Sequence, residues 1–193
     1  GPAMLLLLLG LLLQVGLRAF QPSLHSQAAQ LPAPPSAPLL SLLSLGEKEA
    51  LARLLMLRLR ASDYQAGAAL SLKDLDDERL VAWLERLLEL DPRGQAPLRA
   101  ASRYYAEVDD PPLQRRMLAF IRRAYDDDPA RRWPWLVHGV VIARHRLEDL
   151  PLALELAHPL TNNPSAPPWV RAMESLLKRE MRAGDFVYGI SVA

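Results

Sequence analysis

The stretch Asp126–Gly139 reads "DDDPARRWPWLVHG" and places three acids, two prolines and two tryptophans within fourteen residues. A proline in the first turn of a helix loses no intrahelical hydrogen bond, and a carboxylate just before it can accept the free N–H groups of that turn. We therefore predict that one helix ends at the acids. The next helix, over residues 133–146, would be started by Pro129 or Pro134.

Similar boundaries recur along the chain. The sequence reads "LELDP" at 88–92, "YDDDP" at 125–129 and "LTNNP" at 160–164, and these prolines stand 37 and 35 residues apart. A recurrence at about 34 to 37 residues, with two helices in each interval, indicates repeated helix pairs. The connections between the predicted helices are short, which favours antiparallel neighbours.

Composition extends the helical prediction to the whole chain after residue 40. Leu and Ala are abundant, glycine is scarce at 9 of 193 residues, and β-branched residues are few, a balance that favours helices over strands. Leucines at amphipathic spacing form the predicted buried face of the first helix, namely Leu51, Leu54, Leu55 and Leu59. We predict an all-α domain with helices over 46–61, 76–90, 97–108, 111–126, 133–146, 150–161 and 167–182.

This pattern resembles the tetratricopeptide (TPR) repeat. Trp135 and Gly139 are four residues apart, as in the first helix of that repeat. The second helix of the repeat is matched by Ala153, Ala157 and Pro164. The resemblance covers residues 76–193 and implies antiparallel helix pairs in a degenerate, TPR-like right-handed superhelical array of about three units.

The N-terminal segment is almost purely apolar. Met4–Leu17 reads "MLLLLLGLLLQVGL", and the 17 residues from Met4 to Phe20 would span about 25 Å as a helix, against ~30 Å for a bilayer core. We predict an uncleaved membrane anchor over residues 1–20, with a cleaved signal peptide and a buried core helix as the alternatives. The flanking residues leave the orientation open, and we favour a periplasmic position for the domain that follows.

The composition changes again after the anchor. Residues 21–39 are rich in Pro, Ala, Ser and Gln, which is typical of an extended spacer that forms no core. Apart from Arg18, residues 1–46 contain no Asp, Glu, Lys or Arg, whereas charges are dense further on. We therefore divide the chain into an anchor (1–20), a Pro/Ala-rich linker (21–39) and a TPR-like α-helical domain (40–193).

The sequence argues against several classes of function. Lys and Arg total 23 against 22 Asp and Glu, without the basic excess that is typical of nucleic-acid-binding proteins. The absence of cysteine excludes thiolate metal sites and cysteine nucleophiles. His138 and His145 share one predicted helix face, yet two such ligands need a third group from another helix. We predict no catalytic, cofactor-binding or metal-binding residue, and we expect neither a nucleic-acid nor a small-molecule ligand.

Arginines are concentrated in the middle of the predicted array. Residues 98–146 contain ten Arg against one Glu and five Asp, a net charge of +4. A basic strip of this kind can bind an acidic partner segment or lipid phosphates, and the exposed apolar end of a helical array can bind a partner as well. We also predict that Trp133 contacts the partner, because it precedes Pro134 and lies outside the regular part of the predicted helix. The predicted partner-binding residues are Arg115, Arg122, Arg123, Arg131, Arg132, Trp133, Phe186 and Tyr188.

The phrases "RRWPWL" and "LELDPRGQ" also resemble a group of uncharacterised membrane-anchored bacterial proteins, and this resemblance implies the bacterial inner membrane. We predict a membrane-tethered scaffold without enzyme activity. It would bind a protein partner and help to assemble or stabilise a membrane complex, as an accessory subunit if the association is permanent. Two alternatives stay open: an envelope enzyme with His138, His145 or Tyr104 in a pocket, and a lipid- or precursor-binding protein.

Overall fold

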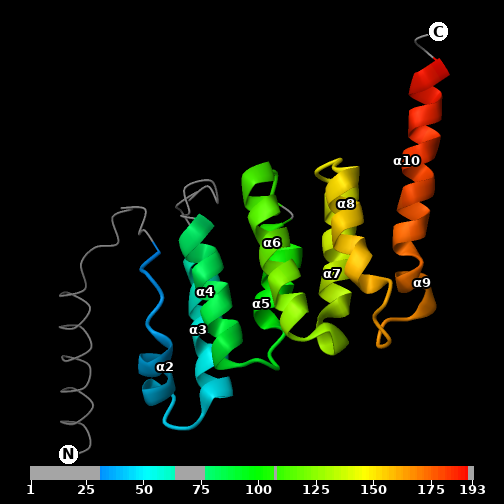
Figure 1. The fold of residues 1–193 in the computed structure, drawn as a ribbon. Helices are drawn as coiled ribbons and strands as arrows, with labels where there is room; N and C mark the ends of the chain where they lie inside the picture. The colour runs from blue at the N-terminus through cyan, green and yellow to red at the C-terminus, as the bar shows by residue number, and fades with distance from the viewer. Residues whose placement is uncertain (1–30, 64–76, 107, 191–193) are drawn as a thin grey trace, which may run out of the picture. The chain divides into compact units, whose positions relative to one another are not determined.

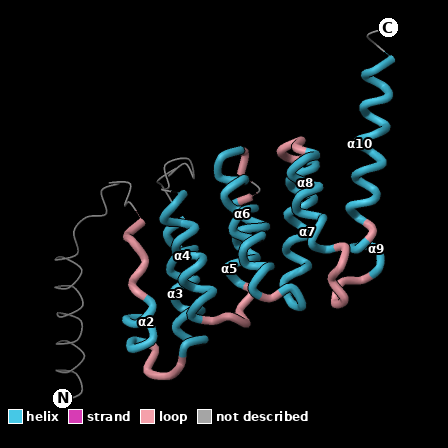
Figure 2. The backbone as a smooth tube through the Cα atoms, viewed as in Figure 1, coloured by secondary structure: helices cyan, strands magenta, loops and turns pink. Residues whose placement is uncertain are grey.

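The described part of the chain is a series of helices. The computed structural model describes residues 31–63, 77–106 and 108–190, and the side chains of 31–60, 77–106 and 108–183. Every regular element in these residues is helical, which confirms the predicted all-α class (Figure 1; Figure 2). The elements are α2 (Ala37–Leu43), α3 (Lys48–Asp63), α4 (Asp77–Leu90), α5 (Ala96–Ala100), the π-helix η2 (Ala101–Tyr105), α6 (Pro111–Asp127), α7 (Pro129–His145), α8 (Leu150–Ala157), the 3-10 helix η3 (His158–Leu160), α9 (Pro168–Arg171) and α10 (Met173–Ile190).

Aspartate and proline together define where α6, α7 and α8 begin. Each of these helices has a proline in its first turn. The preceding residues, Asp110, Asp128 and Asp149, each accept a hydrogen bond from the backbone N–H three residues further on. A carboxylate at this position pairs a free N–H and suits the positive end of the helix dipole. Capping by a carboxylate just before a first-turn proline, expected at the acids of residues 126–128, is confirmed at Asp128 and recurs at Asp110 and Asp149.

α7 begins earlier than predicted. Asp128 is its cap and Pro129 stands at its start, so the helix runs Pro129–His145 instead of 133–146. Pro134 therefore lies inside α7, where it has no N–H to donate to the carbonyl one turn earlier. Of the two prolines that could start this helix, Pro129 does so because it is the one that follows a capping aspartate.

One core cluster extends through the described helices. It runs from Leu31 to Leu177, and its buried aromatic side chains are Trp83, Tyr105, Phe120, Tyr125 and Trp135. Gly139 lies where α7 contacts both α6 and α8. A Cβ atom at this glycine would come within 3.3 Å of Leu118 and 3.7 Å of Leu156. The missing side chain thus allows the three helices to approach closely.

Polar contacts between neighbouring helix pairs join residues whose separation in the sequence is close to the interval between the boundary prolines. The ion pairs between α4 and α6 include Arg116–Glu78 at 3.2 Å and Arg123–Glu85 at 2.7 Å. Both join residues 38 apart, so α4 and α6 run parallel to each other. Tyr125 of α6 donates a hydrogen bond to the carbonyl of Pro159 at 3.0 Å, 34 residues further along. Corresponding helices of successive pairs are therefore joined at close to the spacing of the boundary prolines.

The helical unit begins before the predicted boundary at residue 40. It starts at Leu31, whose side chain is buried. Arg79 donates to the Leu31 carbonyl at 3.0 Å, and the indole of Trp83 donates to the carbonyl of Pro32 at 2.7 Å. A proline-rich segment has carbonyl groups without backbone partners, so side chains of α4 can bind it although it forms no regular structure.

The predicted linker is thus divided between two parts of the chain. Residues 31–39 belong to the helical unit, and α2 already begins at Ala37. Residues 21–30 and the predicted anchor, residues 1–20, lie outside the described residues. Within the part that the structure describes, no helix is both long enough and apolar enough to cross a membrane.

Three of the four leucines predicted for the buried face of α3, Leu51, Leu55 and Leu59, pack against the core, and Leu54 does not. Leu59 is buried as predicted, but Leu54 is 62% exposed, while Ala52 and Met56 are buried. α3 packs along this face against α2 and α4. Leucines occur on both sides of the helix, so amphipathic spacing alone did not separate Leu54 from the leucines that pack.

Glu174 joins α10 to the end of the preceding helix pair. Its carboxylate accepts a hydrogen bond from the Thr161 hydroxyl at 2.9 Å, and it lies 3.1 Å from Nδ1 of His158 and 2.6 Å from the Lys178 ammonium group. The hydrogen bonds from Lys178, His158 and Thr161 lower the pKa of Glu174 from 4.5 to about 2. The contact therefore depends on an ionised carboxylate.

This carboxylate should contribute to acid sensitivity. Because folding depresses its pKa, Glu174 stabilises the fold fully above about pH 4.5 and loses this effect as the pH falls toward 2. We expect Glu174→Gln to lower the free energy of unfolding at pH 7 by about 1–2 kcal/mol and to weaken its pH dependence between pH 7 and about 3. Urea unfolding of the full chain in detergent measures both. Glu155→Gln on the exposed side of α8 is the control, and equal pH dependence in the two variants would contradict this role.

Candidate partner-binding site between α4, α6 and α7

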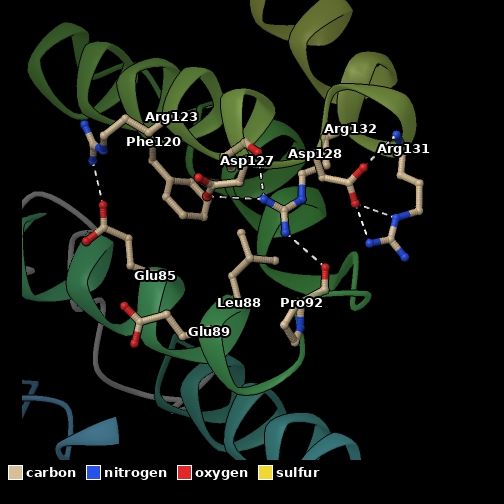
Figure 3. Close-up of a pocket in the computed structure, with 11 residues that line it drawn as sticks. Glu85, Leu88, Glu89, Pro92, Phe120, Arg123, Asp127, Asp128, Arg131 and Arg132 are labelled. Atoms are coloured by element: carbon tan, nitrogen blue, oxygen red, sulfur yellow. Dashed lines mark hydrogen bonds and ion pairs between the residues drawn. The ribbon is translucent and has the colours of Figure 1, made fainter. Parts of the chain in front are cut away.

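A pocket of about 480 Å³ lies where the C-terminal halves of α4 and α6 meet the start of α7 (Figure 3). Leu88 of α4 and Phe120 of α6 contribute to its floor, and both belong to the core. Its rim consists of charged side chains from all three helices. A pocket of this size is large enough for several side chains of a partner or for a small ligand.

The rim is formed by pairs of opposite charge. Figure 3 shows Arg123 with Glu85 at one end of the pocket and Arg131 with Asp128 at the other. The Arg123–Glu85 pair has an N–O distance of 2.7 Å, with 57% and 42% of the two side chains exposed. The side-chain hydrogen bond from Arg131 lowers the pKa of Asp128 below its usual value, so this carboxylate stays ionised. Glu89 adds a further exposed carboxylate to the rim.

Arg132 lies inside this junction and not on its surface. Only 8% of its side chain is exposed. Its guanidinium donates to the carbonyl of Ala124 at 2.7 Å and to that of Pro92 at 3.0 Å, and it lies 3.6 Å from the Asp127 carboxylate. The Ala124 carbonyl is in the last turn of α6, where a cation suits the helix dipole. These hydrogen bonds link α4, α6 and α7, so Arg132 has a structural role at the junction, and its predicted role in partner binding stays a prediction.

The place of Trp133 relative to α7 differs from the predicted one. Because α7 begins at Pro129, this tryptophan is part of the helix and not of a segment before it. Its side chain is partly buried against the core, and it does not line the pocket. This packing explains the side chain within the fold, and its predicted role in partner binding stays a prediction.

Two other predicted arginines lie away from the pocket. Arg115 binds the carboxylate of Asp149, the cap of α8, at 2.6 Å. Arg122 pairs with Asp126 one turn further along its own helix. Neither side chain lines the pocket, so the pocket does not bring all of the predicted arginines together. The last two predicted residues belong to α10 but have side chains outside the described ones, namely Phe186 and Tyr188.

The histidines of the array are not brought to the pocket. His138 is stacked on Trp135, with 6.0 Å between the ring centres, and His145 is exposed near the end of α7. Tyr104 lies under the guanidinium of Arg60, 4.5 Å from its ring centre. Among the side chains that the structure describes, no group of three or more His, Asp or Glu could hold a metal ion.

Sequence reasoning missed the α4 side of the pocket. Glu85 and Glu89 are ordinary exposed positions in an amphipathic helix, and nothing nearby marks them as part of a site. One signal was present, because Glu85 precedes Arg123 by 38 residues, close to the spacing of the boundary prolines, and has the opposite charge. Opposite charges at corresponding positions of successive units indicate that the two helices lie side by side.

No protein-family model, no curated protein and no solved structure matches this chain. The interpretation of the site therefore depends on its own geometry and charge.

Proposed function

We propose that this chain is a membrane-tethered scaffold that binds a protein partner at the pocket between α4, α6 and α7. The pocket itself carries the proposal: exposed ion pairs flank a floor that forms where successive helix pairs meet. Arrays of helix pairs offer extended surfaces of this kind to partner segments. In this proposal the chain recognises and holds a component of a membrane complex, and it catalyses no reaction.

The exposed ion pairs provide a way to bind an acidic partner segment. A pair such as Arg123–Glu85 contributes only about 0–1 kcal/mol while water surrounds it. A partner carboxylate can therefore replace Glu85 at Arg123 at little cost. Once the partner excludes water, the new pair becomes stronger because screening by solvent is reduced. Arg123 and Arg131 retain the predicted role in partner binding, and the binding should weaken as the salt concentration rises.

The wider architecture forms part of the same proposal. The contacts between corresponding helices 34 to 38 residues apart support a TPR-like right-handed superhelical array. Gly139, packed between Leu118 and Leu156, supports it as well. The apolar run over residues 4–20 supports a membrane anchor, and the proposal places it in a bacterial inner membrane with the helical domain on the periplasmic side.

Charge reversal in the pocket should release the partner. We expect the double variant Arg123→Glu and Arg131→Glu to reduce the protein that co-purifies with the chain from native membranes by about tenfold or more, because repulsion replaces attraction at two points. Affinity purification of the full chain, followed by quantitative mass spectrometry, measures this change.

The matched control makes the same change in charge elsewhere. Arg171→Glu and Arg179→Glu together alter exposed positions of α9 and α10. Retention of the partner by the pocket variant, or an equal loss in the control, would exclude the pocket as the binding site. If no protein co-purifies with the unaltered chain, the scaffold function itself is wrong.

A further inference from the structure

Six exposed leucines are concentrated at the N-terminal end of the described unit. They lie in α2, in the turn after it and in α3, and we call them the leucine surface: Leu39, Leu42, Leu43, Leu45, Leu54 and Leu57. Their exposed fractions range from 46% to 90%. Elsewhere among the described side chains, large apolar residues this exposed occur singly on separate elements. Such a concentration indicates that something apolar covers the leucines in the working protein.

On α3 the exposed leucines form a stripe bordered by arginines. At about 100° per residue, Leu54 and Leu57 lie on the side opposite the buried Ala52. Arg53 and Arg58, both exposed, flank this stripe on its two sides. An apolar stripe with basic residues at its edges is typical of helices that lie in the lipid interface. The long arginine side chains can extend from such a position to lipid phosphates.

α2 and the turn after it have no charge, and one of their leucines is held in an unfavourable conformation. Residues 31–46 contain no Asp, Glu, Lys, Arg or His. Leu45, the most exposed of the six at 90%, has a positive φ of 48°. This backbone conformation costs a non-glycine residue about 1–2 kcal/mol. Neither its backbone conformation nor burial in this fold favours leucine there, whereas an external apolar contact would favour it.

The position of the leucine surface in the chain favours a lipid bilayer as its cover. Ten residues, 21–30, separate the predicted anchor from the start of the helical unit. Ten extended residues reach at most about 36 Å, so α2 stays close to any bilayer that holds the anchor. Residues 47–60 add four basic and two acidic side chains, and this excess of positive charge suits anionic lipid headgroups.

We propose that the leucine surface lies at the boundary between the headgroups and the acyl chains of a bilayer, with Arg53 and Arg58 at the level of the phosphates. This proposal rests on the membrane anchor of the proposed function but not on the pocket between α4, α6 and α7. Contact through α2 and α3, added to the anchor, holds the helical unit in one orientation to the membrane. The partner site is then presented to a membrane complex in a defined direction.

The absence of cysteine allows a direct test on the full chain. The variants Leu43→Cys and Leu57→Cys are labelled separately with the environment-sensitive fluorophore NBD and reconstituted into phosphatidylcholine–phosphatidylglycerol vesicles. Glu155→Cys, at an exposed position of α8, is the matched control. We expect doxyl-labelled lipids to quench the labels at positions 43 and 57 at least about three times as strongly as the label at position 155. The emission of these two labels should also be shifted to the blue, because both lie at the depth of an interfacial helix. Aqueous iodide should quench the Glu155 label most.

Vesicle flotation separates the anchor from the leucine surface. If the chain floats with the vesicles but lipid quenches all three labels equally, the anchor stands and the proposal for the leucine surface is overturned. Blue-shifted emission without lipid quenching would show that protein covers the leucines, either another segment of this chain or a second copy, and would overturn it too. A chain that does not float would contradict both the anchor and the proposal. Co-purification of a partner through the pocket is measured independently.

Discussion

Replacement of Arg132 by alanine is expected to lower the free energy of unfolding by about 3 kcal/mol, since each hydrogen bond from a charged donor contributes about 1.5–3 kcal/mol. The guanidinium donates to the carbonyls of Ala124 and Pro92, at 2.7 Å and 3.0 Å. No backbone group replaces it at Ala124, because the N–H of Asp128 donates to Tyr125 instead. The removal of a buried charge, which is costly to desolvate, offsets part of the loss.

The neighbouring arginine supplies the control for this prediction. Arg131→Ala removes an exposed side chain that pairs with Asp128 at the surface, and we expect it to cost less than about 1 kcal/mol. Urea unfolding of the full chain in detergent, followed by far-UV circular dichroism, compares the two variants. Equal stability would show that the links made by Arg132 do not hold the junction together.

The ends of the helices could be predicted more reliably than the sides that face the core. A capping aspartate and a proline act within a few residues, so α6 and α8 begin close to their predicted positions. The buried face of α3 depends on α2 and α4, and Leu54 is exposed because those helices pack elsewhere. Pro32 binds Trp83, 51 residues further on, and no local pattern reveals such a contact.

For the candidate site, the type of residue could be predicted but the role of each residue could not. Arg131 and Arg132 are adjacent and chemically identical, yet one faces solvent and the other lies against α6. They are separated by about 100° around α7, so their roles depend on where the neighbouring helix packs. The sequence pattern predicts that arginines lie near this junction. Only the packing of α4 and α6 shows that Arg123 is exposed at the pocket, where a partner could reach it, and that Arg132 is buried.

The boundary prolines have a role that their spacing does not reveal. The Pro92 carbonyl accepts a hydrogen bond from Arg132, and the Pro129 carbonyl accepts one from Asn163, 40 and 34 residues further on. A proline lacks an N–H but keeps both acceptor positions of its carbonyl, so a side-chain donor can reach it. Each donor lies near the next boundary, which means that each unit is fastened to the one before it. Because one donor is arginine and the other asparagine, no shared sequence motif marks the link.

Asn163→Ala should therefore weaken the link between two units. We expect it to lower the free energy of unfolding by about 3 kcal/mol. The buried amide donates to the Pro129 carbonyl at 2.8 Å and to the Tyr125 hydroxyl at 3.0 Å, and its oxygen accepts from the N–H of Ser165 at 2.9 Å. All three partners would lose a bond. Asn162→Ala changes the same residue type at an exposed position, and we expect it to stay within about 0.5 kcal/mol of the parent. If urea unfolding in detergent gives both variants the same stability, apolar contacts alone hold this boundary.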